Sequence, residues 1–141
     1  MKKIILIIFG IDILLSAHFI RTNGIVKDTR THLEWQDNYN STADKITKYS
    51  WMNAISYCEN LVIDGKSDWR LPNKKELVTI IDYKIYNPSI NSTFQKSFPG
   101  NYWSSTSVYP QHLKAWTVYF YAGFMSPEYN KTSSFSVRCV R

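Results

Sequence analysis

The sequence predicts a single α+β domain, and three observations lead to this prediction. The chain has 141 residues, a length typical of one domain. Apolar residues recur at three- and four-residue steps in the middle of the chain and alternate every second position in its last third. Aromatic residues make up 16% of the chain, which is enough to build a core and excludes a disordered protein. Helices followed by a run of strands are typical of an α+β fold.

Residues 1–17 have the pattern of a secretory signal peptide. Lys2 and Lys3 precede a short apolar run, and Ala17 is a small residue where cleavage would occur. The alternative is an uncleaved N-terminal anchor, although a membrane span needs about 20 apolar residues. We therefore expect a secreted, periplasmic or cell-envelope protein whose domain is formed by residues 18–141. Contact with a membrane is expected only through an uncleaved N-terminal segment.

The first half of the domain is expected to form a hairpin and two helices. Residues 24–36 alternate around a polar turn of four residues, which predicts a β-hairpin, and a polar loop follows. Ser50 is a good N-cap residue, and the apolar stripe after it predicts a helix over residues 51–62. Asn73 and Glu76 have the spacing of a capping box, so a second helix is expected from Asn73 to near Asp82.

Period-two alternation in the last third predicts antiparallel strands. The expected strands are residues 102–107, residues 115–121, a strand beginning at residue 124, and residues 134–141. Within the second of these, the alternation places Trp116 on the face opposite Tyr119 and Tyr121. Within the last, it directs Cys139 inward and Arg138 outward.

The two cysteines of the chain are both expected to face the core. Cys58 lies on the apolar stripe of the first helix, and Cys139 on the inward face of the last strand. In an oxidising compartment they are the only intramolecular pair, and their disulfide would close a loop of most of the domain. Such a closure is worth about 4 kcal/mol in the chain-entropy model. The alternative is two buried free thiols. A metal site or other cofactor is not expected, because cysteines and histidines lack ligand spacing.

Three segments of the chain resemble one known family. They are Asp-Trp-Arg-Leu-Pro-Asn-Lys-Lys-Glu-Leu at 68–77, Tyr-Trp-Ser-Ser-Thr at 102–106 and Val-Arg-Cys-Val-Arg at 137–141. Together with residues 25–36 and 54–61, they resemble the Lcl C-terminal (collagen-like protein C-terminal) domain family of bacterial exported proteins, a domain of unknown function. The resemblance runs from about residue 24 to residue 141.

This resemblance implies a C-type-lectin-like fold, with two helices packed on an antiparallel sheet and the N-terminal hairpin close to the C-terminal strand. For function it implies extracellular binding or adhesion, in some members to sulfated polysaccharide, and it transfers no active site. The motif residues are expected to serve the fold, as core residues or as the start of the second helix, rather than as a ligand clamp. These structural residues are Trp69, Arg70, Leu71, Pro72, Glu76 and Trp103.

Some of the same segments are similar to the formylglycine-generating enzymes. An oxidase of that kind needs reactive thiols in a cleft, whereas both cysteines here are expected to face the core. The sequence also has no nucleophile elbow, phosphate-binding glycine loop or HExxH motif. Enzyme activity is therefore not expected, and an oxidase is the least favoured alternative.

The outward aromatic residues of the 115–121 strand are the best candidates for ligand binding. Aromatic faces suit sugar rings, and tyrosine is frequent in binding hot spots. Tyr119 and Tyr121 are expected near Lys114 on a partly exposed face; the alternative is that a second layer of structure covers them. Arg138, Ser104 and Ser105 are weaker candidates.

The charge of the chain bears on its partners. A formal net charge of +6 favours polyanions through its field, whereas nucleic acid is not expected, because no nucleic-acid motif accompanies the scattered basic residues. We therefore expect an exported, non-catalytic module that recognises a surface glycan or acidic polysaccharide. The alternative is a structural or protein-interaction module of an envelope complex.

Overall fold

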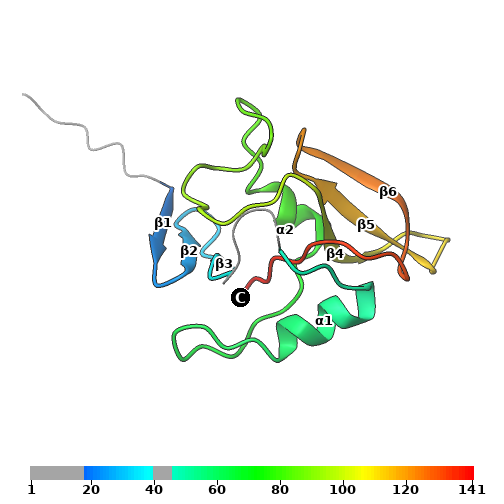
Figure 1. Cartoon of the computed structure of the whole chain (residues 1–141), viewed down its shortest axis with the longest axis horizontal. Helices are drawn as coiled ribbons and strands as arrows, with labels where there is room; N and C mark the ends of the chain where they lie inside the picture. Colours follow the sequence, from blue (N-terminus) through cyan, green and yellow to red (C-terminus); the bar gives the residue numbers. More distant parts are fainter. Residues whose placement is uncertain (1–17, 40–45) are drawn as a thin grey trace, which may run out of the picture.

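The computed structural model describes residues 18–39 and 46–141, which form two three-stranded antiparallel sheets and two helices (Figure 1). The predicted α+β class is confirmed. The expected signal peptide lies outside the described residues. Among the helices that the structure describes, none has the length and apolar character needed to cross a membrane.

The first sheet contains the predicted hairpin and one strand that was not predicted. Its strands are β1 (Phe19–Thr22), β2 (Ile25–Asp28) and β3 (Glu34–Gln36), in that order. The hairpin is confirmed, since β2 pairs with β3. Asn23 and Gly24 both have positive φ values, 50° and 76°, so they form the two-residue turn that joins β1 to β2. This Asn-Gly dipeptide was the available signal for β1.

Both predicted helices form, and both are shorter than predicted. Helix α1 covers Trp51–Glu59 and helix α2 covers Lys74–Val78. The predicted capping box begins α2: Asn73 Oδ1 accepts a hydrogen bond from the Glu76 amide, and a Glu76 carboxylate oxygen accepts one from the Asn73 amide, both at 2.9 Å. The helix does not continue to Asp82, because the chain turns there and Ile81 pairs with Ile90.

The second sheet has strands β4 (Asn101–Ser107), β5 (Lys114–Tyr119) and β6 (Phe124–Asn130), in that order. The alternation predicted for β5 agrees with the pairing across the sheet, because the adjacent residues Thr117 and Val118 pair with the adjacent residues Trp103 and Tyr102 of β4. Both Thr117 and Val118 are buried, so both faces of the sheet are covered at this point. The irregularity between Ala115 and Thr117 lies on β6, where three steps of chain stand opposite two steps of β5. The strand ends at Tyr119, before the predicted end at residue 121.

The C-terminal segment, residues 134–141, is not the regular strand that the alternation predicted. It makes only isolated bridges, including Val140 with Trp35 of β3 and with Arg70. The segment runs between the two sheets and the helices (Figure 1), and all five residues from Ser136 to Val140 are buried. A two-faced pattern therefore does not apply to it. Its backbone bonds to β3 place the N-terminal hairpin beside the C-terminus, as predicted.

A disulfide joins Cys58 of α1 to Cys139 of the C-terminal segment, as predicted, and no cysteine is free. Both residues are fully buried. The bond spans 81 positions of sequence, so it ties the middle of the chain to its last residues.

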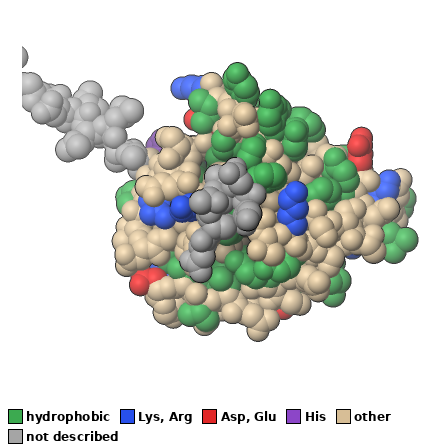
Figure 2. Space-filling view, in the orientation of Figure 1, with side chains coloured by type: hydrophobic (Ala, Val, Ile, Leu, Met, Phe, Trp, Pro, Cys, Tyr) green, Lys and Arg blue, Asp and Glu red, His purple; other side chains and the backbone are tan. Residues whose placement is uncertain are grey.

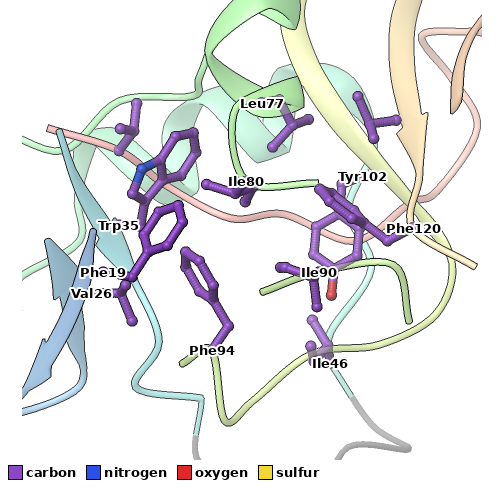
Figure 3. Packing of buried hydrophobic residues seen from close by; sticks show 12 residues of the cluster. Phe19, Val26, Trp35, Ile46, Leu77, Ile80, Ile90, Phe94, Tyr102 and Phe120 are labelled. Carbon is purple, nitrogen blue, oxygen red and sulfur yellow. The ribbon is translucent and has the colours of Figure 1, made fainter. Parts of the chain in front are cut away.

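The core is continuous from the first sheet to the second. Figure 3 shows buried side chains from both sheets and from α2 packed around one interior. Trp35 and Val26 belong to the first sheet and Leu77 belongs to α2. Tyr102 belongs to β4, and Phe120 directly follows β5. The ring of Tyr102 packs edge-on against that of Phe120, with centroids 5.1 Å apart. This packing makes the second sheet a rigid support for the side chains on its outer surface.

Candidate functional site

The residues of the Trp-Arg-Leu-Pro segment hold the fold together. Trp69 and Leu71 are buried, while Arg70 pairs its backbone with that of Val140 in both directions. The Arg70 guanidinium makes two hydrogen bonds to the Glu76 carboxylate, at 2.7 and 2.8 Å. The segment thus joins the C-terminal residues to the start of α2. Pro72 and Trp103 are buried as well.

The ion pair with Arg70 changes the acid–base behaviour of Glu76. Its hydrogen bond from Arg70 lowers the pKa of the Glu76 carboxyl below its ordinary value of 4.5, with the Asn73 amide adding to the effect, and burial only partly opposes it. A carboxylate whose pKa is lowered in the folded state stabilises the fold above its ordinary pKa. That stabilisation is lost as the pH falls through the lowered value.

Glu76→Gln is therefore expected to reduce stability at pH 7 by about 0.5–1 kcal/mol, the usual worth of a well-formed pair near the surface. Glutamine keeps the amide-accepting oxygen of the capping box but loses the charge. The difference between the variant and the native protein, measured by urea unfolding, should narrow as the pH is lowered below 4.5, because native Glu76 loses its charge as the pH falls through its lowered pKa. A difference that stays the same as the pH is lowered would contradict this role.

Arg138 does not face outward, so the prediction that it lies on the surface is wrong. Its side chain has no exposed area. One guanidinium nitrogen donates to the Gln36 carbonyl and, at 3.2 Å, to Asp37; the other donates to the Lys96 carbonyl and, at 3.1 Å, to Ser97. The segment it belongs to is enclosed on all sides. Arg138 is therefore a structural residue and not a ligand contact on the surface.

Asp37 is the acidic partner of Arg138, and the sequence pattern did not predict this role. Its fully buried carboxylate accepts hydrogen bonds from Arg138, from Arg21, and from the backbone amides of Gln95 and Lys96. It thus joins the first sheet, the C-terminal segment and the loop before β4. Its position directly after the predicted hairpin gave no signal of this role.

Three other candidate residues are dispersed. Ser104 is buried, and its hydroxyl donates to the Trp116 carbonyl at 2.7 Å. Ser105 is exposed, on β4. Lys114 begins β5 whereas Tyr119 ends it, and five strand residues span about 17 Å. The expectation that Lys114 lies near the tyrosines is therefore wrong.

Tyr119 of β5 and Tyr121 of the following turn form part of a larger aromatic cluster, here called the aromatic platform: Tyr86, Tyr119, Tyr121 and Phe124. The rings of Tyr119 and Tyr121 are nearly parallel, at 20°, with centroids 5.8 Å apart. Tyr119 also contacts Phe124 edge-on at 5.2 Å, and Tyr121 lies 6.5 Å from Tyr86. The four rings are therefore contiguous.

The platform is open to solvent in the part of the chain that the structure describes. Tyr121, Phe124 and Tyr86 are 40%, 53% and 74% exposed. Figure 2 shows hydrophobic side chains gathered at the top of the molecule, where Figure 1 places the loop before β4 and the β5–β6 turn. An exposed group of large aromatic residues of this kind often marks an interaction site.

Backbone geometry holds the platform in place. Tyr119 and Phe124 face each other across β5 and β6, and the turn between them contains Gly123 with φ +75°. A Cβ at Gly123 would lie 2.9 Å from Ile81, so only glycine lets the turn pack this closely. The Asn87 amide donates to the Tyr121 carbonyl at 2.9 Å, which ties the loop that carries Tyr86 to the turn.

Two of the four platform residues were missed from the sequence. Tyr86 lies in a segment without periodicity, so only the folded chain brings it to the sheet. Phe124 was expected to begin a strand, but a two-residue turn at Ala122-Gly123 would set it opposite Tyr121. The observed turn covers residues 120–123 and sets Phe124 opposite Tyr119.

The described residues contain no group of three or more His, Cys, Asp or Glu side chains placed to hold a metal ion. Residues 24–141 match the family model described as the Lcl C-terminal domain, a match that includes all four platform residues. No curated protein matches the chain.

Proposed function

The chain belongs to the Lcl C-terminal domain family, and from this premise we propose that it is an exported, non-catalytic module that binds a surface glycan through the aromatic platform. The observation that carries the proposal is the set of four contiguous rings at one end of the second sheet, three of them exposed and that of Tyr119 half-buried. Export, an adhesive role and a C-type-lectin-like topology are parts of the same proposal, supported by the resemblance of the sequence motifs.

The chemistry of the platform suits a sugar. The C–H-rich faces of pyranose rings pack on the electron-rich faces of aromatic rings, and Tyr119 and Tyr121 offer two such faces in nearly parallel orientation. Their hydroxyl groups both donate and accept hydrogen bonds. Asn101 lies opposite Tyr119 on β4 and is half-exposed, which adds an amide beside the rings.

Charge favours acidic members of the glycan class. The chain has a net charge of +6, which draws polyanions toward it at low ionic strength. Lys84 is exposed in the same loop as Tyr86. We expect this attraction to set the rate and salt dependence of binding, and the platform rings to set which sugar is held.

Tyr121→Ala is expected to weaken glycan binding at least tenfold, because it removes the central ring of the platform. A glycan array at low salt identifies the ligand, and calorimetry then gives the affinity of each variant. The matched control is Tyr109→Ala, which removes an exposed tyrosine from the other end of the sheet and should leave binding unchanged. Absence of any retained glycan at low salt, or equal affinity of Tyr121→Ala and the native protein, would refute the proposal.

A protein-interaction module of an envelope complex is the second candidate. The observation that favours it is the apolar character of the platform edge, where Phe124 and the adjoining Met125 are both exposed. Capture of one stoichiometric protein partner, lost with Phe124→Ser and accompanied by no glycan binding, would support this candidate over the first. An oxidase is not proposed, because the two cysteines are bonded to each other.

A further inference from the structure

The loop between β4 and β5 carries the two most exposed large hydrophobic side chains of the described residues. Tyr109 is 87% exposed and Leu113 is 81% exposed. This loop, residues 108–113, projects at the right-hand end of the second sheet in Figure 1. It lies at the start of β5, whereas the aromatic platform lies at its end.

The loop is held in shape by its own backbone. The Val108 amide donates to the Lys114 carbonyl at 3.0 Å, and the Lys114 amide donates to the Gln111 carbonyl at 2.8 Å. The Lys131 amide donates to the Leu113 carbonyl at 2.8 Å, which fixes the loop to the end of β6. The two apolar side chains are thus presented to solvent by an ordered loop.

Three lysines lie close to this loop, whose exposed residues Tyr109 and Leu113 are here called the apolar tip. Lys114 begins β5, and Lys131 lies over the Trp51 ring at 4.0 Å while donating to Ser107 at 2.7 Å. Lys74 lies over the Trp116 ring at 3.8 Å, and its amide bonds to Thr106 near the end of β4. None of the three lysines forms an ion pair with a carboxylate in residues 18–39 and 46–141.

We propose that this end of the sheet docks on a membrane surface that contains anionic lipids. Tyr109 and Leu113 enter the boundary between headgroups and acyl chains, and Lys74, Lys114 and Lys131 face the lipid phosphates. The half-exposed rings of Trp51 and Trp116 suit the same depth, since tryptophan and tyrosine are favoured at membrane interfaces.

The combination of groups favours a bilayer over a soluble polyanion. A soluble polyanion would be held by the lysines alone and would gain nothing from Tyr109 and Leu113. An anionic lipid surface can bind both parts of this arrangement. The apolar side chains are buried among the lipids, and the lysines are attracted to the negatively charged headgroups. Docking at this end leaves the aromatic platform free, about 17 Å away along β5.

The test compares vesicle binding of the full chain and its variants. Co-sedimentation uses vesicles of phosphatidylcholine alone and of phosphatidylcholine with 30% phosphatidylglycerol. The Tyr109→Ser/Leu113→Ser variant is expected to partition at least tenfold more weakly into the mixed vesicles. Lys74→Gln/Lys114→Gln/Lys131→Gln is expected to abolish the preference for phosphatidylglycerol. Residues 1–17 are present in every variant, so the comparison isolates the loop.

Controls separate this proposal from the glycan proposal. Tyr86→Ser/Tyr121→Ser removes two exposed rings from the other end of the sheet and should leave vesicle binding unchanged. Binding of dextran sulfate, a soluble polyanion, should be unchanged in Tyr109→Ser/Leu113→Ser. Equal vesicle binding by Tyr109→Ser/Leu113→Ser and the native protein, or equal loss in the Tyr86→Ser/Tyr121→Ser variant, would overturn the proposal, and neither result bears on glycan binding.

Discussion

Replacing Asp37 with alanine is expected to lower the free energy of unfolding by about 3–5 kcal/mol, the usual cost of leaving one member of a buried ion pair without its partner. The Arg138 guanidinium would remain enclosed with its charge uncompensated. The amides of Gln95 and Lys96 would also lose their acceptor. Urea unfolding measures the change.

Two comparisons test this explanation. Asp64→Asn removes the charge of an exposed aspartate that makes only a long, 3.4 Å contact with Asn23, and asparagine tolerates the positive φ of 50° at this position, so it should change stability by less than about 0.5 kcal/mol. Asp37→Ala combined with Arg138→Met should cost less than the sum of the two single changes, because the double variant leaves no unpaired charge. Strict additivity would show that the two residues do not act as a pair.

Removing the disulfide with Cys58→Ala/Cys139→Ala is expected to cost about 2–5 kcal/mol. The bond closes a loop of 81 positions, so its loss restores much conformational freedom to the unfolded chain. Thermal unfolding followed by circular dichroism measures the change. The native protein under reducing conditions is the control, and it should unfold close to the variant. Unfolding of the double variant at the same temperature as the oxidised native protein would contradict this role.

The elements that the sequence predicted well are those with local rules. The capping box of α2 needs only Asn73 and Glu76 three positions apart, and the β2–β3 hairpin needs only alternation around a polar turn. Each of these two elements is specified by residues close together in the sequence, so the rest of the fold has little influence on it. The disulfide joins residues 81 positions apart, and its prediction rested on inward faces for Cys58 and Cys139. Cys139 is buried because all of residues 136–140 are buried, not because of an alternating pattern.

The errors arise where long-range packing, rather than the local sequence, determines which side chains are buried. The segment 134–141 alternates like a strand, but it lies in the centre of the molecule, so Arg138 is buried with the residues on either side of it. In β5, the adjacent residues Thr117 and Val118 lie on opposite faces and are both buried, so burial does not follow the alternation. A period-two pattern assumes one wet face and one dry face, and neither segment meets that condition.

The candidate site was predicted only in part, for a related reason. Tyr119 and Tyr121 were found because the alternation predicted for residues 115–121 places them on the same face. Tyr86 joins them only through long-range packing of the loop before β4, which no local pattern reports. Lys114 was placed near them because it directly precedes the predicted strand, although a strand is long enough to separate its two ends.

The central position of residues 134–141 has a consequence for how the protein is made. Trp35, Asp37 and Cys58 all receive their partners from this last stretch. While it is still inside the ribosomal tunnel, the emerged chain has neither the covalent link nor the occupant of its interior. Residues 134–141 must therefore have left the tunnel before the native topology can form.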